Sequence, residues 1–338
     1  MVGVVTCNSV AVIGETLAAV CAEAYPDVRI LVVDNGSTDG TRELVAARFP
    51  EVRVVPLHEN RGPNPARNRI LAEAERGLAL ILDDDCAPAP GCLRALVRAA
   101  QDYPDGAAFG ARVVYRSDPG RIQFEGALVH FVGEAVQYLH DVPVEAAPRA
   151  VRPVTGLGGG CMLLRPELWR EAGGFDEFYF FGREDSELVF RLQLAGHRAY
   201  VVPTAKVLHD YVPRGLAAGF YQIRNRWVLM GSLYRLRTLV LLAPALLVHE
   251  LVIAGFMAAS GRLGDYARGT LAAARALPHI RARRRAVAAI RRVPDRAVLA
   301  AGPIAVREDL LDTPWKRRLK GALDAFYSGY WRLVGRFV

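Results

Sequence analysis

Short apolar runs alternate with segments of helical periodicity over the first 85 residues of the chain. Runs rich in β-branched residues and leucine predict strands, and the longer segments between them predict helices. The expected strands are Val2–Val5, Arg29–Val33, Val52–Pro56 and Leu78–Leu82, and the expected helices are Ile13–Ala24, Thr41–Arg48 and Pro65–Arg76. This alternation predicts an α/β fold with mainly parallel strands and with helices on both faces of the sheet.

The pattern is less regular after residue 85. Further strands are expected at Ala107–Tyr115, Cys161–Leu164 and Tyr200–Val202, and a further helix is expected from Pro166. Beyond Val212 the strand pattern ends, and the sequence predicts helices joined by arginine-rich connections. We therefore expect an α/β domain at residues 1–212 and a helical region at residues 213–338.

Polar residues cluster where the predicted strands end. The clusters are Thr6–Asn8, Asp34–Gly40, His58–Arg69 and Asp83–Asp85. In sheets of parallel strands the carboxyl ends share one edge, and ligands bind beyond that edge. The four clusters therefore predict a single binding site.

The three aspartates of the last cluster carry the most specific chemistry. Because side chains alternate along an extended chain, Asp83 and Asp85 can point the same way while Asp84 points elsewhere. Two converging carboxylates repel each other unless a cation lies between them, and oxygen ligands of this kind suit Mg²⁺ or Mn²⁺. An isolated acidic triplet is more often a solvated turn, but the neighbouring clusters favour a cation site.

Three other polar residues each have a structural and a functional interpretation. Asp34 either begins a turn or accepts hydrogen bonds from a nucleobase or ribose; Gly36 and Val45 exclude an EF-hand calcium loop. Arg67 is either an exposed residue of an amphipathic helix or a phosphate ligand near the start of that helix. His209 is either a structural histidine or a metal ligand.

Two segments after residue 150 contain further candidate residues. The glycine-rich stretch Gly156–Gly160 precedes a strand, so it is not a dinucleotide fingerprint, but consecutive glycines indicate close approach of the backbone to another group. Glu184 and Asp185 lie at the expected start of a helix. Acidic residues there either stabilise the helix terminus or perform chemistry.

The composition indicates a folded cytoplasmic chain. Of the 338 residues, 52% are hydrophobic and 23% are charged, which is typical of a protein with a large core and excludes disorder. The five cysteines have no spacing typical of metal sites, which predicts reduced thiols. The N-terminal apolar run is too short for a signal peptide.

The C-terminal part is basic and follows a long apolar stretch. Residues 262–338 contain 17 Lys and Arg and 6 Asp and Glu, which predicts an anionic partner. The 21 residues of Leu239–Ala259, interrupted by Pro244, His249 and Glu250, are long enough to span a bilayer. The histidine and the glutamate would be costly in lipid.

We therefore expect one or two hydrophobic helices that lie on the cytoplasmic leaflet, with a spanning segment or a buried core helix as alternatives. The basic run Arg281–Arg285 fits an anionic membrane surface better than nucleic acid, because no nucleic-acid motif accompanies it. The expected location is cytoplasmic, with peripheral attachment to the inner face of the cell membrane.

Taken together, the motifs resemble those of the inverting family 2 glycosyltransferases with a GT-A fold. The resemblance extends over residues 2–210 and is carried by Val5–Ser9, Val32–Thr41, Asn60–Gly62 with Ala66–Asn68, Leu82–Asp85, Gly173–Glu177 and Glu184-Asp185. Within the family it is most similar to the branch that includes bacterial rhamnosyltransferases of cell-envelope glycan assembly. The segment Gln222–Trp227 is one residue too long for the QxxRW signature, so transfer of single sugars is expected.

The resemblance implies a nucleotide-diphosphate sugar donor, a saccharide or lipid-linked saccharide acceptor, and Mg²⁺ or Mn²⁺ as cofactor. The roles that it implies are catalysis by Asp185 as general base with Glu184 beside it, nucleotide-sugar binding by Thr6, Asp34, Arg67, Asp83 and Asp84, metal binding by Asp85 and His209, and an acceptor side formed by Gly159, Gly160, Gly174 and Asp176.

Two rival functions use similar features. A nucleotidyltransferase that makes sugar nucleotides would need a basic, glycine-rich loop after the first strand, and Thr6–Gly14 is neither basic nor glycine-rich. A non-catalytic membrane-bound scaffold would not need Asp83, Asp85 and Asp185.

Overall fold

The computed structural model describes residues 1–75, 77–137, 139–210, 219–304, 306 and 312–338. Contacts divide the chain into two compact units. Unit 1 comprises Met1–Gly126, Leu139–Gln193 and His197–Arg214, and unit 2 comprises Ala127–Tyr138, Leu194–Gly196 and Gly215–Val338. The domain boundary expected between residues 212 and 213 lies outside the described residues, so it stays a prediction.

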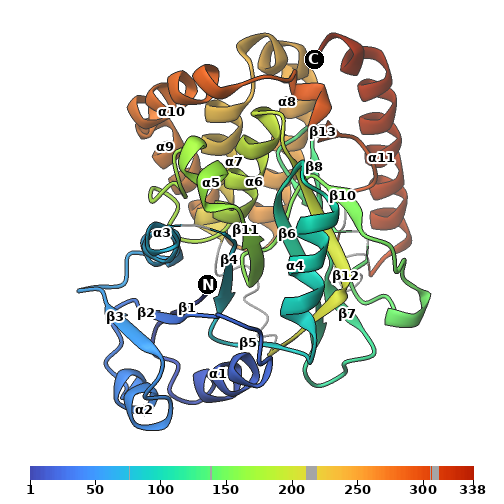
Figure 1. Ribbon diagram of the computed structural model, residues 1–338. Helices are drawn as coiled ribbons and strands as arrows, with labels where there is room; N and C mark the ends of the chain where they lie inside the picture. Colours follow the sequence, from blue (N-terminus) through green and yellow to red (C-terminus); the bar gives the residue numbers. More distant parts are fainter. Residues whose placement is uncertain (76, 138, 211–218, 305, 307–311) are drawn as a thin grey trace. The chain divides into compact units, whose positions relative to one another are not determined.

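Unit 1 is built from a sheet and its covering helices (Figure 1). Its strands are β1 (Val2–Thr6), β2 (Ile30–Asp34), β3 (Arg53–Pro56), β4 (Ala79–Asp83), β5 (Cys86–Pro88), β6 (Gly106–Tyr115), β7 (Ile122–Phe124), β10 (Arg152–Val154), β11 (Cys161–Leu164) and β12 (Arg198–His209). Its helices are α1 (Ile13–Ala22), α2 (Thr41–Arg48), α3 (Pro63–Glu73), α4 (Cys92–Asp102), α5 (Pro166–Glu171) and α6 (Glu184–Leu194), with a 3₁₀ turn η1 (Val144–Ala146).

The order of strands in this sheet is β10-β12-β6-β11-β4-β1-β2-β3, with β5 beside β12 and β7 beside β6. The strands β4, β1, β2 and β3 are parallel, as the sequence predicts. Thr6 lies opposite Asp34 in the register, and Val5 lies opposite Asp83. The carboxyl ends of these strands therefore meet at one edge of the sheet.

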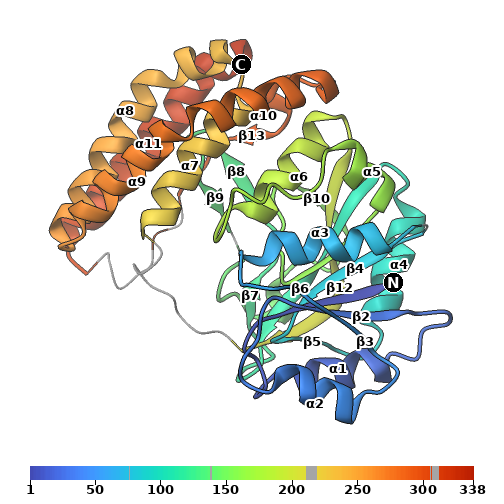
Figure 2. The same ribbon diagram turned by 90° about the vertical axis from the view of Figure 1, so that its left-hand side faces the viewer.

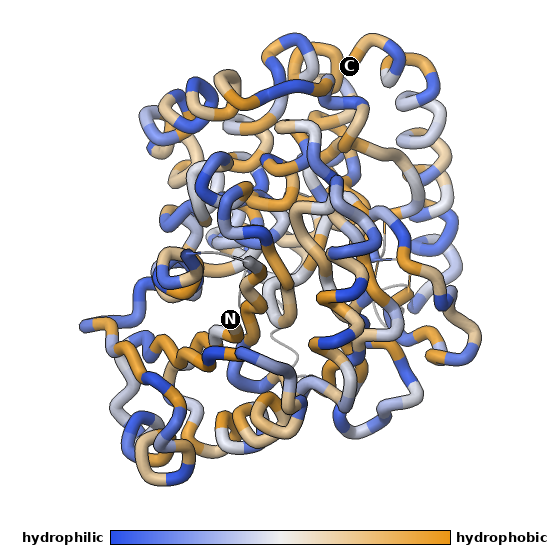
Figure 3. Tube along the Cα trace, viewed as in Figure 1, coloured by the Kyte–Doolittle hydropathy of each residue, from blue (hydrophilic) through white to orange (hydrophobic). Residues whose placement is uncertain are grey.

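Helices cover both faces of the parallel strands, which confirms the expected α/β arrangement. On one face, Ile70 of α3 packs against Gly3 of β1, so closely that a Cβ atom at Gly3 would collide with it. On the other face, Ile13 and Leu17 of α1 join the core formed by β1 and β4. Figure 2 shows α3 on the opposite side of these strands from α1, and Figure 3 shows the run of β4 as hydrophobic positions. Helix α3 begins two residues earlier than the sequence predicts, because Pro63 is accepted in the first turn of a helix.

The glycine turn Gly173–Glu177 is fixed by side chains from two helices. Asn64 of α3 donates to the Asp176 carbonyl at 2.7 Å, and Asn68 accepts from the Phe175 N–H at 2.8 Å. Arg191 of α6 is 1% exposed, pairs with Glu187 at 2.7 Å and donates to the carbonyl of Gly174 at 2.6 Å. The turn is therefore held by hydrogen bonds to its backbone.

Unit 2 is mainly helical. It contains α7 (Gly219–Leu233), α8 (Leu236–Ala259), α9 (Leu263–Arg275), α10 (Leu277–Ile290), α11 (Pro314–Val334), the 3₁₀ turns η3 (Asp295–Ala297) and η5 (Gly335–Phe337), and the strands β8 (Leu128–His130), β9 (Ala135–Val136) and β13 (Leu299–Ala300). The strands form a small sheet in the order β13-β8-β9. The expectation that strands end beyond Val212 was wrong at β13. That strand is two residues long and gains its stability from pairing with β8, so no local pattern predicts it.

Arg191→Met should destabilise unit 1 strongly, because it removes the guanidinium that pairs with the buried Glu187 carboxylate. Removal of one member of a buried pair costs about 3–5 kcal/mol in free energy of unfolding. Arg98→Met is the matched control, since Arg98 pairs with Asp102 at the same helical spacing on the exposed surface, where such pairs contribute about 0.3–0.5 kcal/mol. Urea unfolding of both variants measures the difference. Equal midpoints for the two variants would contradict a structural role of the buried pair.

Candidate active site

A cavity of about 260 Å³ opens at the carboxyl edge of the sheet of unit 1. Its polar lining includes Arg67, Asp83, Asp85, Gln123, Glu184, Asp185 and His209, with Cys86, Phe124 and the glycines Gly158, Gly159 and Gly160. These residues come from β4, β5, β7, β12, α3, α6 and the glycine-rich loop. The structure therefore brings together eight of the thirteen site residues that the sequence predicts.

Asp85 and His209 face each other across this cavity. Asp85 follows β4, and His209 ends β12, which runs parallel to β6. The His209 Nε2 atom lies 3.3 Å from Asp85 Oδ2. Burial acts to raise the pKa of Asp85, but the hydrogen bond and charge of His209 outweigh it and leave this pKa below its ordinary value.

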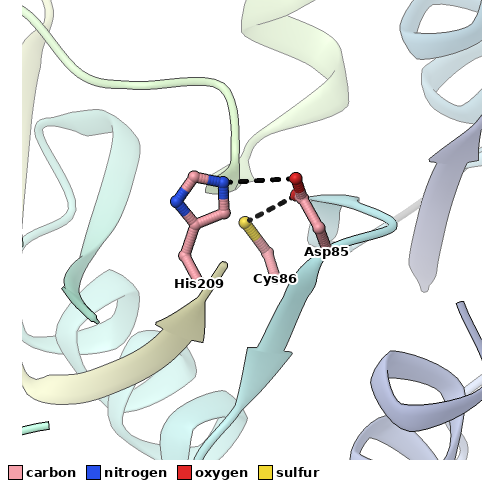
Figure 4. Close-up of side chains that lie close together, drawn as sticks. All are labelled: Asp85, Cys86 and His209. Carbon is pink, nitrogen blue, oxygen red and sulfur yellow. Dashed lines mark hydrogen bonds and ion pairs between the residues drawn. The ribbon is translucent and has the colours of Figure 1, made fainter. Parts of the chain in front are cut away.

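Cys86 completes a cluster of three potential metal-binding side chains (Figure 4). One ligand atom each from Asp85, Cys86 and His209 lies within 4.8 Å of the other two. The Cys86 Sγ atom lies 3.6 Å from Asp85 Oδ1. The cysteine spacing in the sequence gave no signal for this site, because the ligands come from different strands.

A glutamine orients the imidazole of His209. The Nδ1 atom of His209 lies 2.6 Å from the amide oxygen of Gln123. Because this oxygen can only accept, Nδ1 carries a proton, and Nε2 is the ring nitrogen that faces Asp85. A metal-binding histidine is usually oriented in this way. The residues therefore fit a divalent cation between Asp85 and His209.

Arg67 is buried between two carboxylates. Its guanidinium is 3% exposed and lies 3.2 Å from Asp83 Oδ1 and 3.6 Å from Glu184 Oε1. Burial acts to lower the pKa of Arg67, but the carboxylates raise it overall, so the side chain remains a cation. The interpretation of Arg67 as an exposed helical residue is therefore wrong.

The two acidic residues at the start of α6 have different environments. Asp185 Oδ2 accepts the Gly159 N–H at 2.7 Å, and Oδ1 accepts the Ser186 N–H at 2.6 Å. Glu184 is 8% exposed. Burial and the charge of Asp185 raise the pKa of Glu184 to about 7, against the effect of Arg67.

Asp84 lies in the turn after β4 and does not line the cavity, whereas Asp83 and Asp85 do, as the sequence predicts. Its Oδ2 atom accepts the N–H of Cys7 at 3.2 Å. Burial raises the pKa of Asp84 to about 6, although the hydroxyls of Ser9 and Thr6 act in the opposite direction. Asp84 therefore holds the loop that follows β1.

The other predicted residues do not line the cavity. Asp34, fully buried at the end of β2, accepts the Ser37 N–H at 3.2 Å and lies 3.6 Å from Arg42. Thr6 is buried at the end of β1, opposite Asp34 in the register. Gly174 and Asp176 belong to the turn that α3 and α6 hold, and the Asp176 side chain accepts the Phe178 N–H. The binding roles of these four residues stay predictions.

Sequence reasoning did not find Cys86, Gln123 or Phe124. Cys86 could have been noticed because it directly follows the three aspartates. Gln123 and Phe124 lie on β7, a strand of three residues, and no pattern in the sequence relates this strand to His209. Their place in the site follows from the pairing of β7 with β6 and of β6 with β12.

Comparisons with known proteins show what this chain is similar to. The family model for glycosyl transferase family 2 matches residues 1–157. An N-acetylglucosaminyl-diphospho-decaprenol L-rhamnosyltransferase of Mycobacterium tuberculosis is 32% identical over 261 residues, which cover 64% of this chain and 84% of the relative.

Two solved structures have a similar fold. A mannosyltransferase from Pyrobaculum calidifontis, in complex with GDP-Man and Mn²⁺, has a TM-score of 0.51 and 21% identity, covering 99% of this chain and 86% of that chain. GalNAc-T7 with UDP, GalNAc and Mn²⁺ has a TM-score of 0.57 and 16% identity, covering 70% of this chain and 48% of that chain. At these identities the likeness concerns the fold, which is of the GT-A type.

The matched family, the similarity to the rhamnosyltransferase and the fold agree on one conclusion: this chain belongs to glycosyl transferase family 2 and is a rhamnosyltransferase-like glycosyltransferase.

Proposed function

We propose that this chain transfers a sugar from a nucleotide-diphosphate sugar to a hydroxyl group of a lipid-linked saccharide. We further propose that the reaction inverts the anomeric configuration and needs Mg²⁺ or Mn²⁺. The observation that carries the proposal is the cavity itself, where Asp83, Asp85, Asp185 and His209 converge from three segments of the chain. The lipid-linked acceptor is supported by the rhamnosyltransferase, whose name specifies a diphospho-decaprenol substrate.

Arg67 supports a diphosphate on the donor side of the cavity. Its Nε and Nη1 atoms have no hydrogen-bond partner among the described residues, although the side chain is buried. Phosphate oxygens are suitable acceptors for such donors. Asp85 and His209 would hold the divalent cation, which supplies positive charge where the departing diphosphate gains negative charge.

Asp185 is suited to the role of general base. Two backbone N–H groups fix its carboxylate at the cavity wall, and each oxygen keeps a further lone pair. In the proposed step Asp185 takes the proton of the acceptor hydroxyl as its oxygen bonds to the anomeric carbon. The bond from that carbon to the diphosphate breaks on the opposite side. A single displacement of this kind inverts the configuration.

Helix α8 supports contact with a membrane surface. Leu236, Val240, Leu247 and Leu251 are more than 60% exposed and recur at helical spacing on one face. Among the described residues, one helix, α8, is long and apolar enough to cross a bilayer. Of its most apolar stretch of 18 residues, 22% is buried.

The polar residues of α8 explain why we propose a helix that lies on the membrane. His249 contacts the Tyr327 hydroxyl at 2.9 Å, and Glu250 pairs with Arg226 and contacts the Tyr266 hydroxyl at 2.8 Å. These partners belong to unit 2, so α8 cannot leave that unit without exposing a buried ion pair. A helix that stays packed offers only its apolar face to lipid. Anionic lipids suit the arginines of the same unit.

The metal requirement is tested by nucleotide-diphosphate binding. Binding measured by calorimetry should be much tighter with Mn²⁺ than with a chelator, because Asp83 and Asp85 alone repel phosphate. Asp85→Asn should abolish most of the gain from Mn²⁺. Equal affinity of the unmodified protein in chelator would contradict the metal assignment. A panel of nucleotide sugars, monitored for release of the nucleoside diphosphate, identifies the donor.

Gly159→Ala should displace Arg67, because a Cβ at this position would overlap the guanidinium. We expect donor binding and turnover to fall at least about tenfold, the effect of about 1.4 kcal/mol. Gly158→Ala is the control, since its Cβ would meet the Phe124 ring at 3.1 Å and leave Arg67 in place. Similar donor affinities for the two variants would exclude Arg67 from diphosphate binding.

Asp185→Asn should lower kcat by about 10²- to 10⁴-fold, the range for loss of a general base. The amide retains one of the two backbone hydrogen bonds, so stability should fall by only about 1 kcal/mol. Glu184→Gln should reduce kcat less if Glu184 only adjusts the basicity of Asp185. Measuring kcat, donor affinity and Tm of both variants separates chemistry from folding. A folded, donor-binding Asp185→Asn protein with more than about a tenth of normal turnover would remove Asp185 from this role.

Leu247→Glu combined with Leu251→Glu should weaken binding to anionic vesicles by about tenfold or more, because each exposed leucine offers about 1.5–3 kcal/mol on full burial. Val10→Glu is the matched control, since Val10 is a 37% exposed apolar residue of unit 1. Co-sedimentation with phosphatidylglycerol vesicles measures the effect. If the double variant sediments as well as the unmodified protein, α8 is not the membrane-contacting helix.

A further inference from the structure

We propose that Cys86 is a third protein ligand of the cation at Asp85 and His209, and that its sulfur makes this site prefer Zn²⁺ and Co²⁺ to Mg²⁺. The inference deepens the proposed metal-dependent function and rests on it. The cluster in Figure 4 is the observation that carries it.

The backbone places the sulfur on the same side as the imidazole. Strand β5 pairs antiparallel with β12, and His209 lies directly opposite Cys86 in the register. Side chains of directly opposed residues point to the same face of a sheet. The placement of Cys86 beside His209 therefore follows from strand pairing.

The distances suit a shared cation. The Nε2 atom of His209 lies 3.3 Å from Asp85 Oδ2, and the Sγ atom of Cys86 lies 3.6 Å from Asp85 Oδ1. Metal–ligand bonds of about 2.0–2.3 Å at tetrahedral angles place ligand atoms about 3.3–3.8 Å apart. Both contacts have that spacing, each to a different oxygen of the Asp85 carboxylate. With one oxygen of Asp85 as the ligand, the three ligand atoms all lie within 4.8 Å of one another, and rotation of the side chains would bring them to the ligand spacing of a single cation.

Neighbouring residues preserve this arrangement. Gln123 accepts the Nδ1 proton of His209, which directs Nε2 toward Asp85. A Cβ at Gly160 would lie 3.0 Å from Cys86 Sγ, so the glycine leaves the sulfur its present position at the cavity wall. Cys86 lines the cavity, although it also packs against the core of unit 1.

The sulfur changes which cation the site favours. Thiolate is a soft ligand that selects Zn²⁺ and other late transition metals, whereas Mg²⁺ prefers oxygen. On binding, the cation replaces the thiol proton, which passes to solvent. Zn²⁺ is usually four-coordinate and would have one position left after three protein ligands, whereas a six-coordinate Mn²⁺ would have three. Zn²⁺ should therefore bind tightly and hinder the binding of a diphosphate.

The experiment is a Co²⁺ titration of the full-length protein, followed by absorption spectroscopy. Coordination of Co²⁺ by a thiolate gives a charge-transfer absorption in the near ultraviolet. We expect this absorption in the unmodified protein and in Cys7→Ser, a thiol control from the same edge of the sheet, but not in Cys86→Ser. We also expect Cys86→Ser to lose at least about tenfold in Zn²⁺ affinity, while its affinity for Mn²⁺ changes much less.

Further variants separate failure of the inference from failure of the proposed function. Cys86→Ala, checked by Tm, replaces Cys86→Ser if the serine variant does not fold. Suppose that Co²⁺ binds and that Asp85→Asn abolishes its binding. If the thiolate absorption is then absent, or if it persists in the variant without Cys86, the inference is wrong and the metal-dependent function stands. If no divalent cation binds in an Asp85-dependent manner, the proposed metal requirement itself fails.

Discussion

The buried guanidinium of Arg67 is the group on which the organisation of the cavity depends. It lies between Asp83 and Glu184 and above the ring of Phe175, at 5.6 Å from its centroid. Without this charge the carboxylates at the end of β4 and at the start of α6 would repel each other at short range. The absence of a side chain at residue 159 follows from the same constraint, because the guanidinium occupies the space that a Cβ would need.

The carboxylates around the cavity acquire different properties from their surroundings. Asp85 faces an imidazole and has a lowered pKa, whereas burial raises the pKa of Glu184 to about 7 and that of Asp84 to about 6. Carboxyl groups of one chemical type therefore suit the different roles proposed for them, as cation ligand, as neighbour of a base and as support for a loop. Such divergence of pKa values is typical of sites that perform acid–base chemistry.

In helix α8 of unit 2, polar side chains face inward and apolar side chains face outward, which is the opposite of the usual arrangement in a surface helix. The histidine and glutamate near its middle contact partners inside the unit, and leucine and valine side chains face outward. In a water-exposed unit this arrangement leaves apolar area in water, which favours burial against another apolar phase. The same polar contacts hold the helix to the unit.

The sequence by itself determined the parallel strands β1 to β4, their helices and the edge where Asp83 and Asp85 lie, because these features depend on local periodicity and on the rules of strand connection. It also indicated the family, through motifs at defined positions. It did not determine that Arg67 is buried, because a helix of low amphipathicity gives no sign of what packs against it. Nor did it reveal Cys86 and Gln123 beside His209, or strand β13. These features arise from pairing between segments far apart in the chain, and that pairing is decided by the packing of the whole unit.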